Sequence, residues 1–337
     1  MRYALAFTLG LLPAPVFAQS DCGPAPAPVL NLAFDSRYAE DDPDRATLDE
    51  AREAAAKAAL DPLDDFVQDL ANGLEAALSD EDPAQRADLA ACLLSRMGDW
   101  ARADALAQLG TTTVELTIGS RLAAFAIMAG QAASLAPSSA DLDDIRAWLV
   151  RRMDEQMNFW ETAPDRASQN NLRAWAALAG AATAGLVDDP VMRGWAAWSI
   201  AYVICSVDED GSLPQEMRRG KYALHYQLHA LAPLTTAAVL LRAQGIDLAD
   251  RCDGALGRSV RFALSDLEDG QRTQGITGEV QSYFDGSDTL ETWQLAWLES
   301  YLVLDPDPAI DTFVNPLRPL SYSKLGGNQT LIFGHGR

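Results

Sequence analysis

The chain has 337 residues, a hydrophobic content of 48% and a formal net charge of −22 at pH 7. A chain of this length can bury a large core, and its negative charge disfavours nucleic acid as a partner because the two would repel each other. An anionic polymer could bind only where basic residues concentrate against this acidic background.

The N-terminus predicts an export signal. Arg2 provides a positive start, residues 4–12 form an apolar run, and the segment ending at Ala18 has the small-residue pattern of a cleavage site. The run is too short to anchor the chain in a bilayer, although a buried N-terminal helix is an alternative. We expect cleavage near Ala18, no membrane insertion, and a periplasmic or secreted product in which residues 19–337 form one domain.

The four cysteines fit an oxidising compartment, where two disulfides can form in three possible pairings. None of them is spaced as CxxC, and the sequence contains three histidines. We therefore expect no metal site and no organic cofactor. The cysteines are Cys22, Cys92, Cys205 and Cys252.

Amphipathic patterns typical of α-helices cover most of the remaining chain. From Leu89 to Ala103, apolar residues recur at intervals of three and four on one helical face. Runs with period-two alternation are nearly absent, so the fold class is all-α. Short breakers favour antiparallel helical hairpins that close into an (α/α) toroid or incomplete barrel. Further helical stretches cover roughly 45–60, 62–79, 112–133, 139–158, 168–186, 190–206, 218–244, 251–268 and 286–303.

Tryptophan at helical spacing more often lies in the core than binds a ligand. We therefore expect Trp195, Trp198 and Trp297 to pack inside the protein, and leave the role of Trp175 open.

Three polar segments could carry chemistry. The first, residues 34–47, is a loop with Arg37 and Tyr38 ahead of a predicted helix. Loops of this composition usually only connect helices, so this segment alone is a weak signal.

The second polar segment, residues 165–175, carries Asn170, Asn171 and Arg173. Two adjacent asparagines near a helix start are unusual because side-chain amides compete with backbone hydrogen bonds. They could line a cleft, or they could form an N-terminal cap with an Asx turn.

The third segment, residues 207–226, places Arg218, Arg219 and Lys221 near the start of a predicted helix. Three cations there oppose the helix macrodipole, which costs stability unless an anion binds. Arg219 and Tyr226 lie two helical turns apart, so a guanidinium and a phenol could face one cleft. A solvated basic face with a packing tyrosine is the alternative.

Taken together, these segments resemble the alginate lyases whose catalytic domain is an (α/α) toroid, in particular the periplasmic enzymes that cut polymannuronate. The resemblance covers nearly the whole mature chain, and its motifs occur in the same order. It implies an all-α toroid that acts as a polysaccharide lyase. The motifs are SRY at 36–38 with DRATLDE at 44–50, DWARADAL at 99–106, NNLRAW at 170–175, DGSLPQEMRR at 210–219, ALHYQLHAL at 223–231 and KLGGNQT at 324–330.

The resemblance also implies site residues. The family's cleft asparagine, arginine and tyrosine fall on Asn171, Arg219 and Tyr226, and its lid residues fall on Arg37 and Tyr38. β-Elimination at a 4-linked uronate removes the C5 proton and expels O4, once the C6 carboxylate is neutralised. Arg219 and Asn171 can donate hydrogen bonds to that carboxylate, and Tyr226 can act as acid and base.

One position departs from the family pattern, because Leu172 stands where the family has a histidine. In mannuronate the C5 proton and O4 lie on the same face of the ring, so Tyr226 could perform both proton transfers. His229 is a candidate replacement base, with a packed histidine as the alternative. Arg173 and Arg218 are further candidates for contacts with the substrate.

The sequence therefore predicts a monomeric lyase acting on an anionic polysaccharide, with alginate or polymannuronate as the first choice. Two alternatives stay open. One is a non-catalytic polysaccharide-binding or export-associated protein that lost turnover with the histidine, and the other is a lyase for another polyuronate such as glucuronan.

Overall fold

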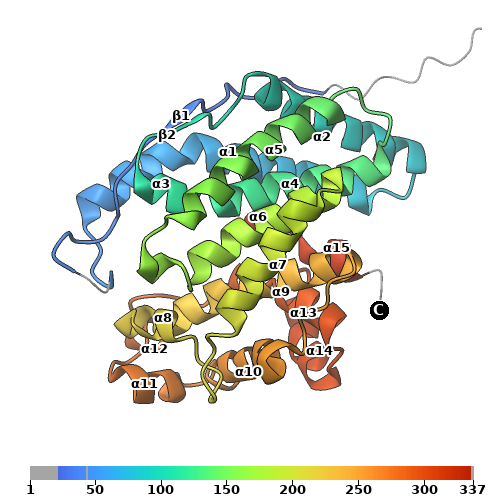
Figure 1. Ribbon diagram of the computed structural model, residues 1–337. Helices are drawn as coiled ribbons and strands as arrows, with labels where there is room; N and C mark the ends of the chain where they lie inside the picture. The colour runs from blue at the N-terminus through green and yellow to red at the C-terminus, as the bar shows by residue number, and fades with distance from the viewer. Residues whose placement is uncertain (1–21, 43–44, 335–337) are drawn as a thin grey trace, which may run out of the picture.

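The computed structural model describes residues 22–42 and 45–334 (Figure 1). The export signal predicted for residues 1–18 lies outside the described residues. Among those that are described, no helix is long and apolar enough to cross a membrane.

An inner ring of helices forms the core of the molecule, and its members are labelled in Figure 1. Each helix of this ring packs against the next, and the last returns to the first, so the ring closes on itself. In order around the ring these helices are α1 (Glu50–Ser79), α4 (Gly119–Leu135), α6 (Asn171–Val187), α9 (Ala223–Ala243), α13 (Leu298–Leu304) and α15 (Gln329–Gly334).

A second set of helices covers the outside of this ring, each packed against one or two inner helices. This two-layer arrangement confirms the predicted (α/α) toroid. The outer helices are α2 (Pro83–Arg102), α5 (Leu142–Glu161), α7 (Pro190–Ile204), α10 (Arg251–Ser265) and α14 (Pro308–Val314).

Shorter elements connect the two layers. β1 (Asn31–Leu32) pairs with β2 (Gln108–Leu109) in parallel, and β3 (Ser321–Tyr322) pairs with β4 (Gly327–Asn328) in antiparallel orientation. The short helices are α3 (Thr112–Thr117), α8 (Pro214–Met217), α11 (Gln271–Thr277), α12 (Ser282–Asp285), η1 (Asp165–Ala167), η2 (Gly220–Tyr222), η3 (Thr292–Leu295), η4 (Asn315–Leu317) and η5 (Ser323–Leu325).

The local sequence explains where several of these helices begin. Asp82, Asp189 and Asp307 each stand directly before a proline and accept hydrogen bonds from backbone N–H groups of the first turn. An aspartate cap satisfies donors that the helix itself leaves free, and a proline at the first position has no N–H to satisfy. These three pairs therefore fix the starts of α2, α7 and α14.

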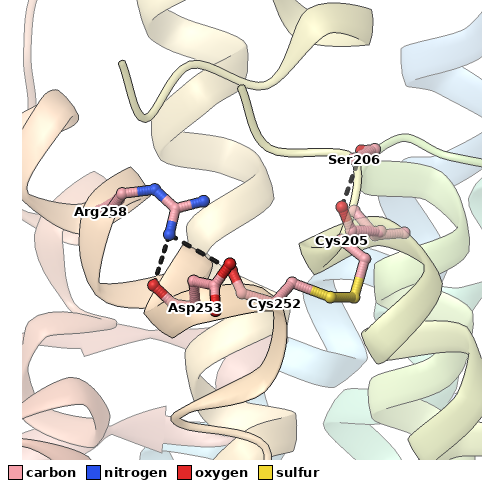
Figure 2. Close-up of a disulfide and its surroundings, with 6 residues drawn as sticks. Cys205, Ser206, Cys252, Asp253 and Arg258 are labelled. Carbon is pink, nitrogen blue, oxygen red and sulfur yellow. Dashed lines mark hydrogen bonds between the residues drawn. A yellow bond between two sulfur atoms is a disulfide. The ribbon is translucent and has the colours of Figure 1, made fainter. Parts of the chain in front are cut away.

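Two disulfides join elements that are distant in sequence, and they settle which of the three pairings the structure adopts. Cys22 bonds to Cys92 on α2, and Cys205 at the end of α7 bonds to Cys252 on α10. Beside the second bond, Arg258 donates hydrogen bonds to the carbonyl oxygens of Cys252 and Asp253 (Figure 2).

The tryptophan expectations were right at two positions and wrong at one. Trp297 is fully buried and Trp195 is partly buried against the core, but Trp198 on α7 is 55% exposed. Trp175 is buried, and its indole N–H donates to His229 at 3.0 Å.

Candidate active site

A loop between β1 and α1 covers one end of α9. The backbone N–H of Ala39 donates to the carbonyl of Thr47, and that of Asp49 donates to the carbonyl of Arg37, so the two arms of the loop hold each other. In Figure 1 this loop is the blue segment at the left edge of the molecule. It carries Arg37 and Tyr38 to Tyr226 on α9, and we call its described residues, 36–42 and 45–48, the lid.

The phenol of Tyr226 lies at the centre of a polar cluster. Its hydroxyl accepts a hydrogen bond from Arg37 Nη2 at 3.1 Å and forms a short hydrogen bond with the hydroxyl of Tyr38. Arg37 also donates to Tyr38 at 3.0 Å. The guanidinium of Arg219 stacks on the Tyr226 ring, 3.8 Å from its centroid. Four of the predicted site residues therefore meet at one point.

This cluster changes the acidity of both phenols. Burial by itself raises the pKa of Tyr226, but the positive charges of Arg219 and Arg37 outweigh that effect and lower it below the ordinary value. Burial, together with the neighbouring Tyr226, raises the pKa of Tyr38 to about 12. Tyr226 is thus the phenol that loses its proton first, and Tyr38 is the donor between them.

Arg219 reaches this position from a turn that precedes α9. α9 begins at Ala223, so the cations predicted to open this helix lie in the short segments before it. Gly220 follows Arg219 with φ of +55°, and a Cβ there would come within 2.6 Å of a Glu279 carboxylate oxygen. The Nη2 of Arg219 donates to the carbonyl of Arg45 in the lid at 2.7 Å.

Asn171 is held by a buried carboxylate. Glu216 on α8 accepts from the backbone N–H of Asn171 at 2.8 Å, and its two oxygens lie 3.1 and 3.0 Å from Asn171 Nδ2. Asn170 is the N-cap of α6 and accepts from the N–H of Leu172, so the predicted capping role belongs to Asn170. Burial raises the pKa of Glu216 to about 7, against the opposing effects of Asn171 and Arg219.

A cavity of about 390 Å³ lies beside the cluster, within the size range of small-ligand sites. Four arginines and three acidic residues line it, so the wall is basic relative to the rest of this acidic chain. Neither Tyr226 nor Asn171 is part of its wall, and Tyr226, 7% exposed, contacts the wall residue Tyr38. The lining includes Tyr38, Glu40, Arg45, Arg52, Leu172, Glu216, Arg218 and Arg219.

Two of the predicted substrate contacts lie elsewhere. Arg173 is not part of the cavity wall and donates to Ser199 on α7 at 3.2 Å. His229 accepts from Trp175 through Nε2, and burial lowers its pKa well below the ordinary value, so the ring is neutral. Arg218, in contrast, is exposed and lines the cavity.

Glu216 and Lys324 were not among the predicted site residues. Burial, reinforced by nearby Arg121, lowers the pKa of Lys324 to about 7. Arg121 itself pairs with Asp64 at 2.7 Å. Both missed residues lie inside motifs that were recognised, DGSLPQEMRR and KLGGNQT. The available signal was a charged side chain within a recognised motif.

Comparison with known proteins identifies the family. The alginate lyase family model matches residues 113–273. An alginate lyase of Pseudomonas syringae pv. tomato is 30% identical over 322 residues, which cover 93% of this chain and 82% of that protein. The chain belongs to the alginate lyase family. A second relative, an alginate lyase of Cobetia marina, is 28% identical over 93% of this chain and 83% of its own.

Solved structures agree with the family on the fold. A histidine-to-alanine variant of alginate lyase A1-III, complexed with tetrasaccharide, aligns with a TM-score of 0.78 at 22% identity, over 96% of this chain and 88% of that one. Alginate lyase A1-III from Sphingomonas species A1 aligns with a TM-score of 0.74 at 21% identity, over 95% and 88%.

Proposed function

We propose that this member of the alginate lyase family cleaves mannuronate-rich alginate, or a closely related 4-linked polyuronate, by β-elimination at Tyr226. The family makes the chain a polysaccharide lyase. The observation that carries the proposal is the contact of one buried phenol with two guanidinium groups, those of Arg219 and Arg37.

Binding begins with the negative charge of the substrate. Arg219 lies in the wall of the cavity and also touches the Tyr226 ring, so it can pair with the C6 carboxylate of the sugar whose C5 proton is removed. A charge-assisted hydrogen bond strengthens as negative charge develops on that carboxylate. Arg218 is exposed on the same wall and is suited to a neighbouring uronate.

Tyr226 then transfers the protons. As phenolate it takes the proton from C5, the C4–O4 bond breaks as the C4=C5 double bond forms, and the phenol returns its proton to O4. In mannuronate both groups lie on one face of the ring, so one side chain suffices. The positive charges that lower the pKa of Tyr226 increase the fraction of phenolate near neutral pH.

The hydrogen bonds of Asn171 constrain its role. Glu216 engages its amide nitrogen through both carboxylate oxygens, and among the described residues its Oδ1 has no partner. Asn171 can donate to the substrate only after Glu216 is protonated or the amide rotates. We therefore assign carboxylate neutralisation first to Arg219, with Asn171 as a second donor.

Leu172 leaves the cavity without a histidine at that position, and His229 does not replace it. The Nε2 of His229 is occupied as an acceptor by Trp175, and the ring is neutral and lies outside the cavity wall. This arrangement favours substrates that one tyrosine can process, which supports mannuronate over its C5 epimer.

We also propose that the protein works in the periplasm as a monomer, after removal of residues 1–18. The two disulfides support an oxidising location.

The test of the proposal is Tyr226→Phe, which keeps the ring under Arg219 and removes the hydroxyl. We expect a loss of at least about a thousandfold in the formation of unsaturated sugar ends from polymannuronate, because both proton transfers use that oxygen. The product is followed by its ultraviolet absorbance. Tyr222→Phe, which removes a hydroxyl from the turn before α9, is the matched control and should retain activity. Full activity of Tyr226→Phe would overturn the mechanism.

Leu172 also favours a second candidate, a protein that binds the polysaccharide without cleaving it. This candidate predicts binding across a panel of uronate polymers, glucuronan included, with no new double bond. A Leu172→His variant that gains activity on alginate would mark a site that lost its base.

A further inference from the structure

The outer face of α7 carries two exposed aromatic side chains. Trp198 is 55% exposed and Tyr202 is 36% exposed. Their rings are nearly parallel, with an interplanar angle of 8° and centroids 5.2 Å apart. The two rings are therefore stacked on each other, with the rest of their surface exposed to solvent, and we call this pair the platform. Figure 1 shows α7 running across the front of the molecule.

A buried cation backs this platform. Arg173 reaches it from α6 and is 4% exposed, with its guanidinium carbon 4.6 Å from the Trp198 ring centroid and 5.5 Å from that of Tyr202. Its Nε donates to Ser199. Within the described residues no carboxylate pairs with Arg173, although the chain contains 48 acidic residues. Burial lowers the pKa of Arg173, which reflects this unpaired position.

These features combine two kinds of recognition chemistry. The face of an aromatic ring packs against the apolar face of a sugar ring, and an uncompensated cation favours an anionic ligand over a neutral one. A uronate supplies both a pyranose face and a carboxylate. We propose that Trp198, Tyr202 and Arg173 form an accessory platform for a uronate unit of the polymer, outside the catalytic cavity.

Buried side chains connect the platform to the cavity. Leu172 lines the cavity, and Arg173 follows it in the first turn of α6. Trp160 packs in the same hydrophobic cluster as Leu172 and also lies 5.7 Å from the Arg173 guanidinium. We expect a polymer that extends beyond the cavity past Leu172 to reach the platform. This inference rests on the proposed function, because the ligand of the platform is the substrate polymer.

The support under the platform is rigid. Cys205 is the C-cap of α7, and its disulfide to Cys252 ties that end of the helix to α10 (Figure 2). Tyr202 lies three residues before this bond. A fixed pair of rings loses little conformational entropy when a sugar binds.

The test compares ligands of two lengths. In the double variant Trp198→Ala/Tyr202→Ala we expect affinity for long polymannuronate to fall roughly tenfold, as the loss of two stacking rings implies. Affinity for a mannuronate trisaccharide should fall much less, so the ratio of the two affinities drops. Both are measured by titration calorimetry with Tyr226→Phe added to every protein, so that the polymer is bound but not cleaved. Val191→Ala removes an exposed apolar side chain from the start of α7 and is the matched control.

Three results would overturn the inference. The first is unchanged affinity of the double variant for the polymer, and the second is an equal loss of affinity for polymer and trisaccharide. The third is a dimeric wild type that becomes a monomer in the double variant, which would make this face a contact between two copies of the chain. Because binding is measured apart from turnover, a wild-type protein that forms no double bond would refute the proposed function and leave this test valid.

Discussion

A phenol between two guanidinium groups responds to the loss of either one. Since Arg219 is the larger of the two favourable effects on Tyr226, Arg219→Met should raise the pKa of the phenol. The alkaline rise of kcat/KM would then shift upward by about one pH unit or more. A pH–rate profile on polymannuronate measures this shift, with Arg218→Met as the control on the same wall. A rise at the same pH in both variants would show that Tyr226 does not titrate in catalysis.

The buried carboxylate of Glu216 links pH to stability. Its pKa is raised to about 7, so the folded protein binds this proton more tightly than the unfolded chain does. The contribution of this proton to the free energy of unfolding is complete below the pKa that Glu216 has in the unfolded chain, and it is lost as pH rises through 7. In Glu216→Gln this dependence disappears, so the variant should gain up to roughly 3 kcal/mol relative to the wild type between pH 5 and 8. Urea denaturation at several pH values tests it, and parallel curves would contradict it.

At the residue scale, the sequence predicted which side chains form the cluster, but not the hydrogen bonds that hold the residues around it. It selected Arg37, Tyr38, Arg219 and Tyr226, and these four side chains lie together. The hydrogen bonds between Asn171 and Glu216 were not predicted, because the two residues are 45 positions apart in sequence and such a contact leaves no periodic pattern. The sequence also did not predict that the side chain of Arg173 points away from the cavity, although neighbouring residues on a helix point about 100° apart.

At the scale of elements, hydrophobic periodicity located the helices but not all of their ends. The two stretches predicted separately at 45–60 and 62–79 are one helix, α1, which contains Pro62. A proline inside a helix costs about 3 kcal/mol, and burial of residues that follow it, such as Leu63 and Phe66, offsets this cost. The short helices α11, α12 and α14 were missed because a helix of one or two turns contains too few residues to show a period.

The disulfide at the end of α7 should contribute substantially to stability. It closes a loop of 47 residues, and Cys205→Ser/Cys252→Ser should lower the free energy of unfolding by about 4 kcal/mol on the chain-entropy model. Chemical denaturation without reductant measures the loss. Adding reductant to the double variant should then change stability only through the remaining bond, Cys22–Cys92. Equal stability of wild type and variant would contradict the expectation.

At the scale of the whole molecule, the C-terminal segment closes the ring. β4 packs on α1, and Gly327 in β4 has φ of +103° with Ala71 of α1 only 3.2 Å from the position of an added Cβ. Gly327→Ala should destabilise the protein by about 1–3 kcal/mol, since an alanine would be strained at this positive φ and has little room between β4 and α1. Thermal unfolding provides the measurement, and Gly275→Ala, where a Cβ meets open space, is the control. If the two variants unfold at the same temperature, the contact between β4 and α1 can adjust to the added methyl group.

The overall toroid was predictable because it follows from the number and order of amphipathic helices. The closure between the two ends of the chain was not, because β3 and β4 contain two residues each and pair through backbone atoms. A pairing of this length leaves no alternating pattern in the sequence.

The lid sets an order of events for the whole enzyme. The hydroxyl of Tyr38 and the guanidinium of Arg37 already occupy the hydrogen-bonding positions of the Tyr226 oxygen, where a sugar must come to react. For a sugar to take those positions these two side chains must leave the phenol, so we expect the lid to withdraw from Tyr226 before the sugar reaches it. Withdrawal is a unimolecular step. The observed rate of substrate capture should therefore reach a maximum at high polymer concentration, and this maximum equals the rate constant of lid withdrawal.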